Sequence, residues 1–100
     1  MNLTWLPEAR IEVQEAVEWY EDQRAGLGEE LAGELAHVVS LIERFPDAWH
    51  PLTKRIRRQR LDRFPYNVVY ARAAQEIVVL VFSHQHRHPG YWRKRLKGIP

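Results

Sequence analysis

Basic side chains concentrate in two short segments of this chain. Six of the ten residues from Lys54 to Arg63 are Lys or Arg, and five more lie between Arg87 and Lys97. An arginine guanidinium binds a carboxylate or a phosphate through two parallel hydrogen bonds. The two segments therefore predict a cationic surface that contacts phosphate groups or an acidic protein, and their residue types alone do not separate these partners.

The charge of the chain is divided between its two halves. Residues 1–50 carry a net charge of −8 and residues 51–100 a net charge of +10, whereas the whole chain carries only +2. Such a division indicates a folded domain with an acidic side and a basic side. A solvated strand whose arginines pair with the acidic half is the simplest alternative. We favour an anionic partner, because so many arginines on one short strand repel each other.

The expected contact residues for phosphate or a protein partner are basic, apart from one tryptophan. They are Arg55, Arg57, Arg58, Arg63, Trp92, Arg93 and Arg95.

Three histidines alternate along the chain at His84, His86 and His88. In an extended strand their imidazoles share one face, with Cα atoms about 6–7 Å apart, which is compatible with a metal. The chain has no cysteine, and hardly any carboxylate lies nearby to complete a ligand shell. We therefore expect no metal site, and a proton-transfer role for one histidine is the more useful hypothesis.

The composition predicts one folded domain over residues 1–100. The chain is 45% hydrophobic with four Trp, which is typical of a globule with its own core. The absence of cysteine excludes disulfides and thiol nucleophiles. There is no glycine-rich phosphate loop, no signal-like segment and no apolar run of the roughly 20 residues that a membrane span needs. We expect a cytoplasmic protein without membrane contact or cofactor.

The pattern of apolar residues predicts an α+β fold with a mostly antiparallel sheet. Ile56 and Leu61 have opposite parity, so the first strand after residue 53 is either bulged or shorter than drawn. The predicted elements, in chain order, are an edge strand Asn2–Leu6, helices Pro7–Arg24 and Gly28–Phe45, strands Ile56–Phe64, Tyr66–Arg72 and Glu76–Gln85, and a short helical segment Tyr91–Leu96.

The two helices are predicted to form an antiparallel hairpin, because the connection between them is short. Their glutamate-rich faces, including Glu8, Glu12 and Glu15, are expected to face water. The apolar faces are expected to cover one face of the sheet through Val13, Val17, Tyr20, Leu31, Leu35, Val38 and Ile42. We expect the turns after Tyr91 to add little to this core, so that the sheet survives loss of residues 92–100.

Several sequence segments, in this order and spacing, resemble the RelE/ParE superfamily of bacterial toxins, and the ParE branch most. They are Glu18-Trp19-Tyr20-Glu21, Gly26-Leu27-Gly28, the run Leu61 to Tyr70 with its Phe-Pro-Tyr centre, Val81-Phe82-Ser83-His84, and Arg87-His88-Pro89-Gly90-Tyr91-Trp92. The resemblance spans nearly the whole chain. It implies a type II toxin that inhibits growth and forms a hetero-oligomer with a cognate antitoxin protein. The four tryptophans are expected to help anchor that partner.

The resemblance also implies two different cellular targets. ParE-like members poison DNA gyrase, which we take as the first expectation. RelE-like members cut mRNA in the ribosome without a metal, and the matching positions here are Arg60, Arg87 and Tyr91, with Lys54 and His88 as secondary ones. A third hypothesis is a non-toxic nucleic-acid-binding module that uses Tyr66, Tyr70 or Tyr91 to stack bases.

Overall fold

The computed structural model of the 100-residue chain describes residues 2–85 and 90–97. The elements are the strand β1 (Asn2–Trp5), the helices α1 (Pro7–Gln23) and α2 (Leu27–Arg44), the strands β2 (His50–Pro51), β3 (Ile56–Arg60), β4 (Tyr66–Arg72) and β5 (Glu76–His84), and the 3-10 helix η1 (Tyr91–Leu96). The predicted α+β class is confirmed. No helix in residues 2–85 and 90–97 has the length and apolar character to cross a membrane.

The described strands form one sheet in the order β1-β5-β4-β3-β2. Strand β1 runs parallel to β5, and the other neighbours are antiparallel. The register of β4 and β5 shifts between Val69 and Tyr70, which leaves Leu80 as an extra residue in β5. This bulge matters below because it frees backbone groups at the β5 edge.

The strand predicted over Ile56–Phe64 was expected to be either bulged or shorter. The structure shows the shorter form, because β3 ends at Arg60. The chain turns there because Glu34 of α2 accepts hydrogen bonds from the backbone N–H groups of Asp62 (2.6 Å) and Arg63 (3.1 Å). Strand β2 was not among the predicted elements, and its two residues pair with Arg58 and Arg57.

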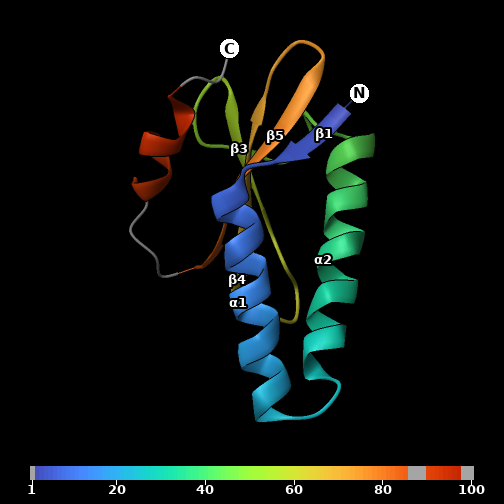
Figure 1. The fold of residues 1–100 in the computed structure, drawn as a ribbon. Helices are drawn as coiled ribbons and strands as arrows, with labels where there is room; N and C mark the ends of the chain where they lie inside the picture. Colours follow the sequence, from blue (N-terminus) through green and yellow to red (C-terminus); the bar gives the residue numbers. More distant parts are fainter. Residues whose placement is uncertain (1, 86–89, 98–100) are drawn as a thin grey trace.

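The α1–α2 hairpin closes through two glycines (Figure 1). Gly26 has φ of 89°, a conformation that glycine adopts without a steric cost. A Cβ on Gly28 would lie 2.6 Å from the carbonyl oxygen of Val17, so only glycine lets the helices approach this closely. Glu21 accepts hydrogen bonds from the N–H groups of both glycines, at 2.8 and 2.9 Å. The predicted antiparallel hairpin is confirmed.

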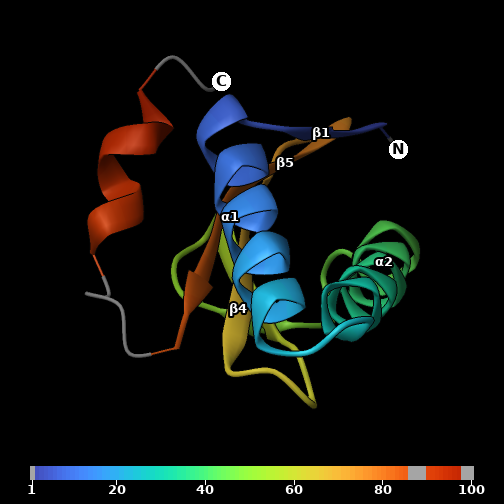
Figure 2. The ribbon, with the colours of Figure 1, turned by 60° about the horizontal axis from the view of Figure 1, so that its bottom comes forward.

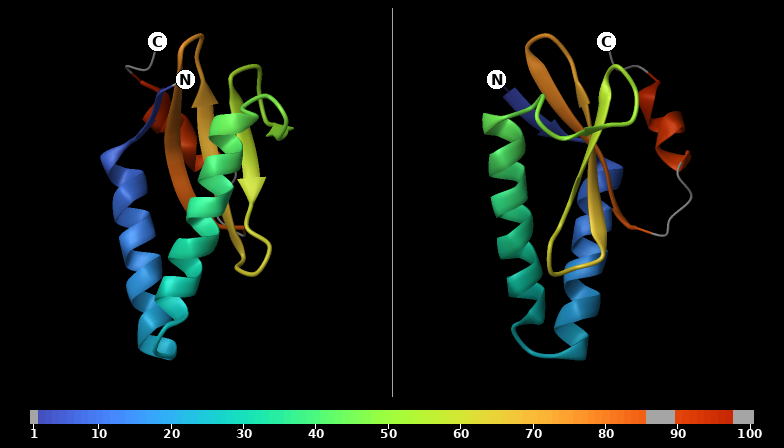
Figure 3. Two further views of the ribbon diagram at one scale, coloured as in Figure 1. Left: turned by 90° about the vertical axis from the view of Figure 1, so that its right-hand side faces the viewer. Right: turned by 180° about the vertical axis from the view of Figure 1, so that it is seen from behind.

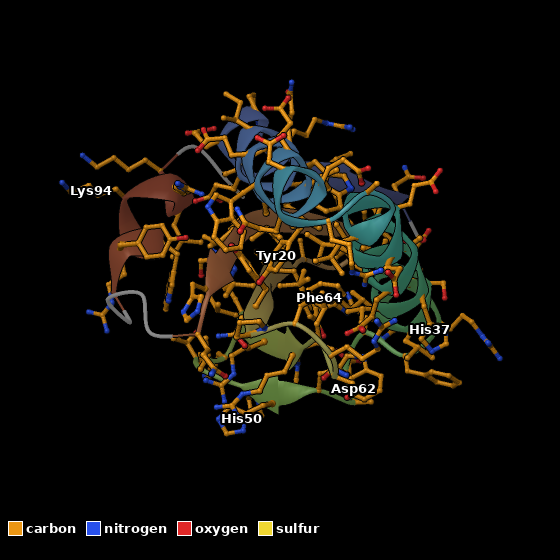
Figure 4. All side chains as sticks on the ribbon, turned by 90° about the horizontal axis from the view of Figure 1, so that it is seen from below. Tyr20, His37, His50, Asp62, Phe64 and Lys94 are labelled. Atoms are coloured by element: carbon orange, nitrogen blue, oxygen red, sulfur yellow. The ribbon has the colours of Figure 1, made fainter. Side chains whose placement is uncertain are left out.

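The hairpin covers one face of the sheet and makes the first core. Figure 4 shows Tyr20 of α1 and Phe64 pointing toward each other in this layer, and their rings pack edge to face with centroids 5.0 Å apart. All seven predicted positions contribute. Leu31, Leu35, Val38 and Ile42 are buried, and Val13, Val17 and Tyr20 are partly buried against the same cluster.

The other face of the sheet has a core of its own under η1. Trp92 is only 6% exposed and packs in a cluster with Ile56, Val69, Ala71, Val78, Leu80 and Val81. Figure 2 shows η1 and α2 on opposite sides of the strands, and the right-hand view of Figure 3 shows the same arrangement from behind. Because η1 closes this second core, we revise the expectation that the sheet survives loss of residues 92–100.

Tyr70 is completely buried in β4, and its hydroxyl donates a 2.6 Å hydrogen bond to the carbonyl oxygen of Pro46. Burial raises the pKa of Tyr70 from 10.0 to about 12, because the buried site disfavours the phenolate. A tyrosine whose pKa rises on folding contributes stability that is complete below pH 10 and is lost as the pH rises toward 12.

We expect the free energy of unfolding to fall between pH 10 and pH 12 by about 2 kcal/mol more in the unmodified chain than in Tyr70→Phe. At neutral pH the same substitution costs only about 1 kcal/mol, the lost hydrogen bond. Urea unfolding at a series of pH values measures both quantities. Equal alkaline slopes in the two proteins would contradict this role of Tyr70.

Candidate functional site

The arginines of β3 divide between the two faces of the sheet. Side chains alternate along a strand, so Arg58 and Arg60 lie on the same face as Ile56, the face that η1 covers. Arg58 lies opposite Val69, and Arg60 lies opposite Asn67. Arg57 lies opposite Tyr70 on the hairpin face.

Arg57 has a structural position. It is partly buried, and its Nη1 donates a 2.9 Å hydrogen bond to the carbonyl oxygen of Trp49. Its Nε is buried and has no partner among the described residues. Arg57 thus anchors the loop that carries β2 instead of presenting its charge to solvent.

Arg63 is separated from the other arginines by the end of β3. Its guanidinium pairs with Glu30 of α2 at 2.7 Å, on the exposed outer side of the hairpin. Hydrogen bonds from Arg63 and then Arg24 lower the pKa of Glu30, and the hydrogen bond to Glu30 raises the pKa of Arg63. Lys54 and Arg55 are exposed in the turn that precedes β3.

The C-terminal helix η1 has one buried side and one cationic side. Trp92 fills the second core, so we leave it out of the contact surface. Arg93 is exposed with its guanidinium carbon 5.7 Å from the centroid of the Trp92 ring, and Lys97 is exposed just after the helix. Lys94 extends outward (Figure 4) beside a recess that it lines with Glu8.

A polar cluster around Glu12 joins η1 to α1 and β5. The Glu12 carboxylate accepts hydrogen bonds from Arg95 (Nη1 to Oε1, 2.8 Å; Nη2 to Oε2, 3.1 Å) and from the Tyr91 hydroxyl (3.0 Å). It also accepts one from the backbone N–H of Phe82 (3.1 Å). The side chains of Arg95 and Glu12 are only 17% and 21% exposed. The hydrogen bond to Glu12 raises the pKa of Arg95, which stays charged.

The cluster forms where the edge of β5 has no neighbouring strand. Strand β1 stops at Trp5, opposite Val79, so β5 continues beyond it with unpaired backbone groups. Glu12 binds the N–H of Phe82, and Arg95 donates a 2.8 Å hydrogen bond to the carbonyl oxygen of Leu80 in the bulge. A buried backbone group without a partner is costly, so this pair protects the sheet edge.

The prediction that Glu12 faces water is wrong. Its i, i+4, i+7 spacing with Glu8 and Glu15 is that of a solvated helix face, but the partner Arg95 lies 83 residues away in the sequence. A local pattern carries no information on such a contact. Three of the six residues in Tyr91–Leu96 are basic, so nothing in the sequence singled out Arg95 as the one that reaches α1.

The site that the RelE resemblance implies is only partly assembled here. Arg60, Asn67 and Ser83 form one row across β3, β4 and β5, and Ser83 makes a hydrogen bond to the Tyr91 hydroxyl. Arg60 and Tyr91 therefore flank the same end of the sheet, with two strand spacings of about 5 Å each between Arg60 and β5. Arg87 and His88 lie outside the described residues.

The surroundings of Tyr91 are acidic. Burial raises its pKa, and Glu12 adds to this rise, so the phenol stays protonated. Beside it lies a recess of about 210 Å³ lined by Glu12, Glu15, Tyr66, Phe82, Ser83, His84 and Tyr91. The lining contains two carboxylates and no Lys or Arg side chain, so this recess is poorly suited to hold a phosphate group.

The histidine pattern extends beyond the described residues. His84 is exposed at the end of β5, with its ring 5.7 Å from that of Tyr66, and His86 lies outside the described residues together with His88. No group of three His, Cys, Asp or Glu side chains suited to a metal occurs in residues 2–85 and 90–97.

The three tyrosines that were proposed to stack on nucleobases are not available for stacking. Tyr70 is fully buried, Tyr66 stacks on Phe82 with centroids 4.7 Å apart on the hairpin face, and the Tyr91 hydroxyl is bound by Glu12. These positions weaken the hypothesis of a module that stacks single-stranded bases on its sheet.

Comparisons with known proteins support the fold. No protein-family model matches the chain, and no curated protein matches it. Among solved structures, the chain is similar to a chain of "Chromosomal ParDE TA system from P. aeruginosa", with a TM-score of 0.62 and 16% sequence identity. The match covers 84% of this chain and 95% of that one. The chain therefore has the α+β fold of a chain from a ParDE system.

Proposed function

We propose that this protein is the toxin of a type II toxin–antitoxin system, that it inhibits growth by poisoning DNA gyrase, and that a cognate antitoxin neutralises it. The observation that carries the proposal is the fold likeness to a chain of the ParDE system, which extends over 95% of that chain. The sequence resemblance to the ParE branch points in the same direction.

The Glu12 cluster supports action through protein contact instead of RNA cleavage. In-line attack on a phosphate needs cationic groups at the phosphorane and a free proton carrier. Here the carboxylate of Glu12 neutralises Arg95 and accepts the hydrogen bond of the Tyr91 hydroxyl. Because Arg95 is already paired with Glu12, its charge is not available to meet the negative charge that develops in RNA cleavage.

The hairpin offers a surface for the antitoxin. Trp19, Ile11 and Phe45 are exposed by 57%, 53% and 48%, although they are large and apolar. Of the other tryptophans, Trp5 and Trp49 are partly buried, and only Trp92 is a core residue. Exposed aromatic residues are typical anchors of protein interfaces, so we place the antitoxin on the hairpin and expect a hetero-oligomer.

One induction culture assayed twice tests the proposed target. We expect growth arrest with gyrase-linked DNA breaks and an SOS response, while the mRNA stays intact. Tyr91→Phe should keep the arrest within about threefold, because the phenol hydroxyl has no chemical step to perform. If the protein were a nuclease with Tyr91 as its proton carrier, the same substitution would lower its cleavage activity on the order of 10²-fold or more.

Arg60→Gln is the matched second variant, because it removes a charge from the same end of the sheet without touching Glu12. Codon-phased mRNA cuts that disappear in Tyr91→Phe, with intact DNA, would overturn the gyrase proposal. Normal growth at high expression without any antitoxin would overturn the toxin proposal as a whole.

A further inference from the structure

Only some of the cations in residues 2–85 and 90–97 have an ion pair within these residues. Four arginines have ion pairs, and each pairs with an acid from the acidic half: Arg24, Arg63, Arg72 and Arg95. Arg58, Arg60, Arg93 and Lys97 are among the cations that have no ion pair within residues 2–85 and 90–97. The acidic half of the protein therefore leaves these four charges uncompensated.

These four residues belong to one side of the molecule, which we call the cationic face. Arg58 and Arg60 lie on the η1 side of β3, about 7 Å apart along the strand. Arg93 and Lys97 come from η1 and the residue after it. Trp92 and Ile56 belong to the same core cluster, and Leu96 packs against it, so η1 lies on the face of the sheet to which Arg58 and Arg60 belong. Lys94 is left out because it shares a recess with Glu8.

The chemistry of the cationic face fits a polyanion whose charges lie along a regular backbone. Such a surface binds phosphates by charge and counterion release, without reading bases. Single-stranded nucleic acid also needs exposed aromatic rings for stacking. The aromatic residues here are Trp92, which is 6% exposed, and Tyr91, which Glu12 holds. A duplex, whose bases are already stacked, needs no such platform.

We infer that the cationic face binds the phosphate backbone of duplex DNA without sequence specificity. This interaction does not depend on gyrase, and it gives the protein a second contact beyond any protein target. DNA is the substrate of gyrase, so a toxin with this face can hold the enzyme and its DNA together. The binding itself is measured with DNA alone, so its failure is distinguishable from failure of the gyrase proposal.

The test is fluorescence anisotropy with a labelled 20-base-pair duplex over a range of salt concentrations. Four phosphate contacts predict a slope of about −3.6 for the logarithm of the association constant against the logarithm of salt concentration. Arg58→Gln/Arg60→Gln should reduce this slope to about −1.8. The matched control is Arg10→Gln/Arg44→Gln, which removes two exposed arginines from the helices and the same net charge. The control should keep the original slope.

Several outcomes overturn the inference. One is the absence of binding at low salt, and another is an equal loss of slope in both double variants, which would indicate a general charge effect. Tighter binding of a single-stranded RNA of the same length would place RNA on the face. Equal competition by polyglutamate at the same charge concentration would indicate an acidic protein. Circular dichroism of both double variants verifies that each is folded.

Discussion

Trp92→Ala should lower the free energy of unfolding by about 3–5 kcal/mol, the usual cost of removing a buried aromatic ring. For a domain of this size, each kcal/mol corresponds to roughly 4–8 °C in Tm, so a fall on the order of 15 °C or more is expected. The reason is that Trp92 is the central side chain between η1 and the sheet face formed by Val69, Val78 and Val81. Chemical denaturation and thermal melting measure the effect.

Trp19→Ala is the matched control, because Trp19 is 57% exposed and stands on the outer side of α1. Its loss should cost less than about 1 kcal/mol. If Trp92→Ala does not fold, Trp92→Phe restores most of the apolar volume and should recover a cooperative transition. Similar stabilities for the Trp92→Ala and Trp19→Ala proteins would show that η1 does not close a core.

Glu12→Ala is expected to have the second-largest effect, a loss of about 2–3 kcal/mol. Removing one partner of a fully buried ion pair costs about 3–5 kcal/mol, because the other charge stays buried and unpaired. Arg95 retains some access to water at 17% exposure, which reduces the penalty. The substitution also leaves the N–H of Phe82 without an acceptor. Urea denaturation measures the stability, and amide hydrogen exchange of Phe82 reports on the edge of β5.

Two matched variants separate this pair from a general effect of charge. Glu15→Ala removes a carboxylate from the next turn of α1, where the side chain is exposed, and should change stability by less than about 0.5 kcal/mol. Glu12→Gln keeps an acceptor for Phe82 and should lie between Glu12→Ala and the unmodified chain. Unchanged exchange of the Phe82 amide in Glu12→Ala would contradict the edge-protecting role.

The helices and the central strands were predictable because their signals are local. The apolar stripe of Leu31, Leu35, Val38 and Ile42 has the period of a helix, and the continuous apolar run of β5 has the length of a strand covered on both sides. The early end of β3 was only one of two predicted versions. Its cause is a contact between Glu34 and the turn after Arg60, and contacts between distant segments leave no periodic signal.

The site was less predictable than the fold for the same reason. Charge density located the basic segments, but only the structure separates Arg58 and Arg60 from Arg57, which is anchored to the Trp49 carbonyl oxygen. Arg95 was predicted as a contact for partner or phosphate, and the structure places it in a partly buried ion pair. The pairing of Arg95 with Glu12 depends on where β1 ends and leaves the β5 edge open.

Purified components give the most direct test of gyrase poisoning by this protein. The chain is incubated with a bacterial gyrase, ATP and supercoiled plasmid, and DNA cleavage complexes are trapped with detergent and protease. We expect linear plasmid to accumulate in proportion to the chain added, and Tyr91→Phe to retain this activity. Gyrase poisoning would be contradicted by two results together. Gyrase would be unaffected by the chain, and purified ribosomes would show codon-phased cutting of mRNA that Tyr91→Phe abolishes.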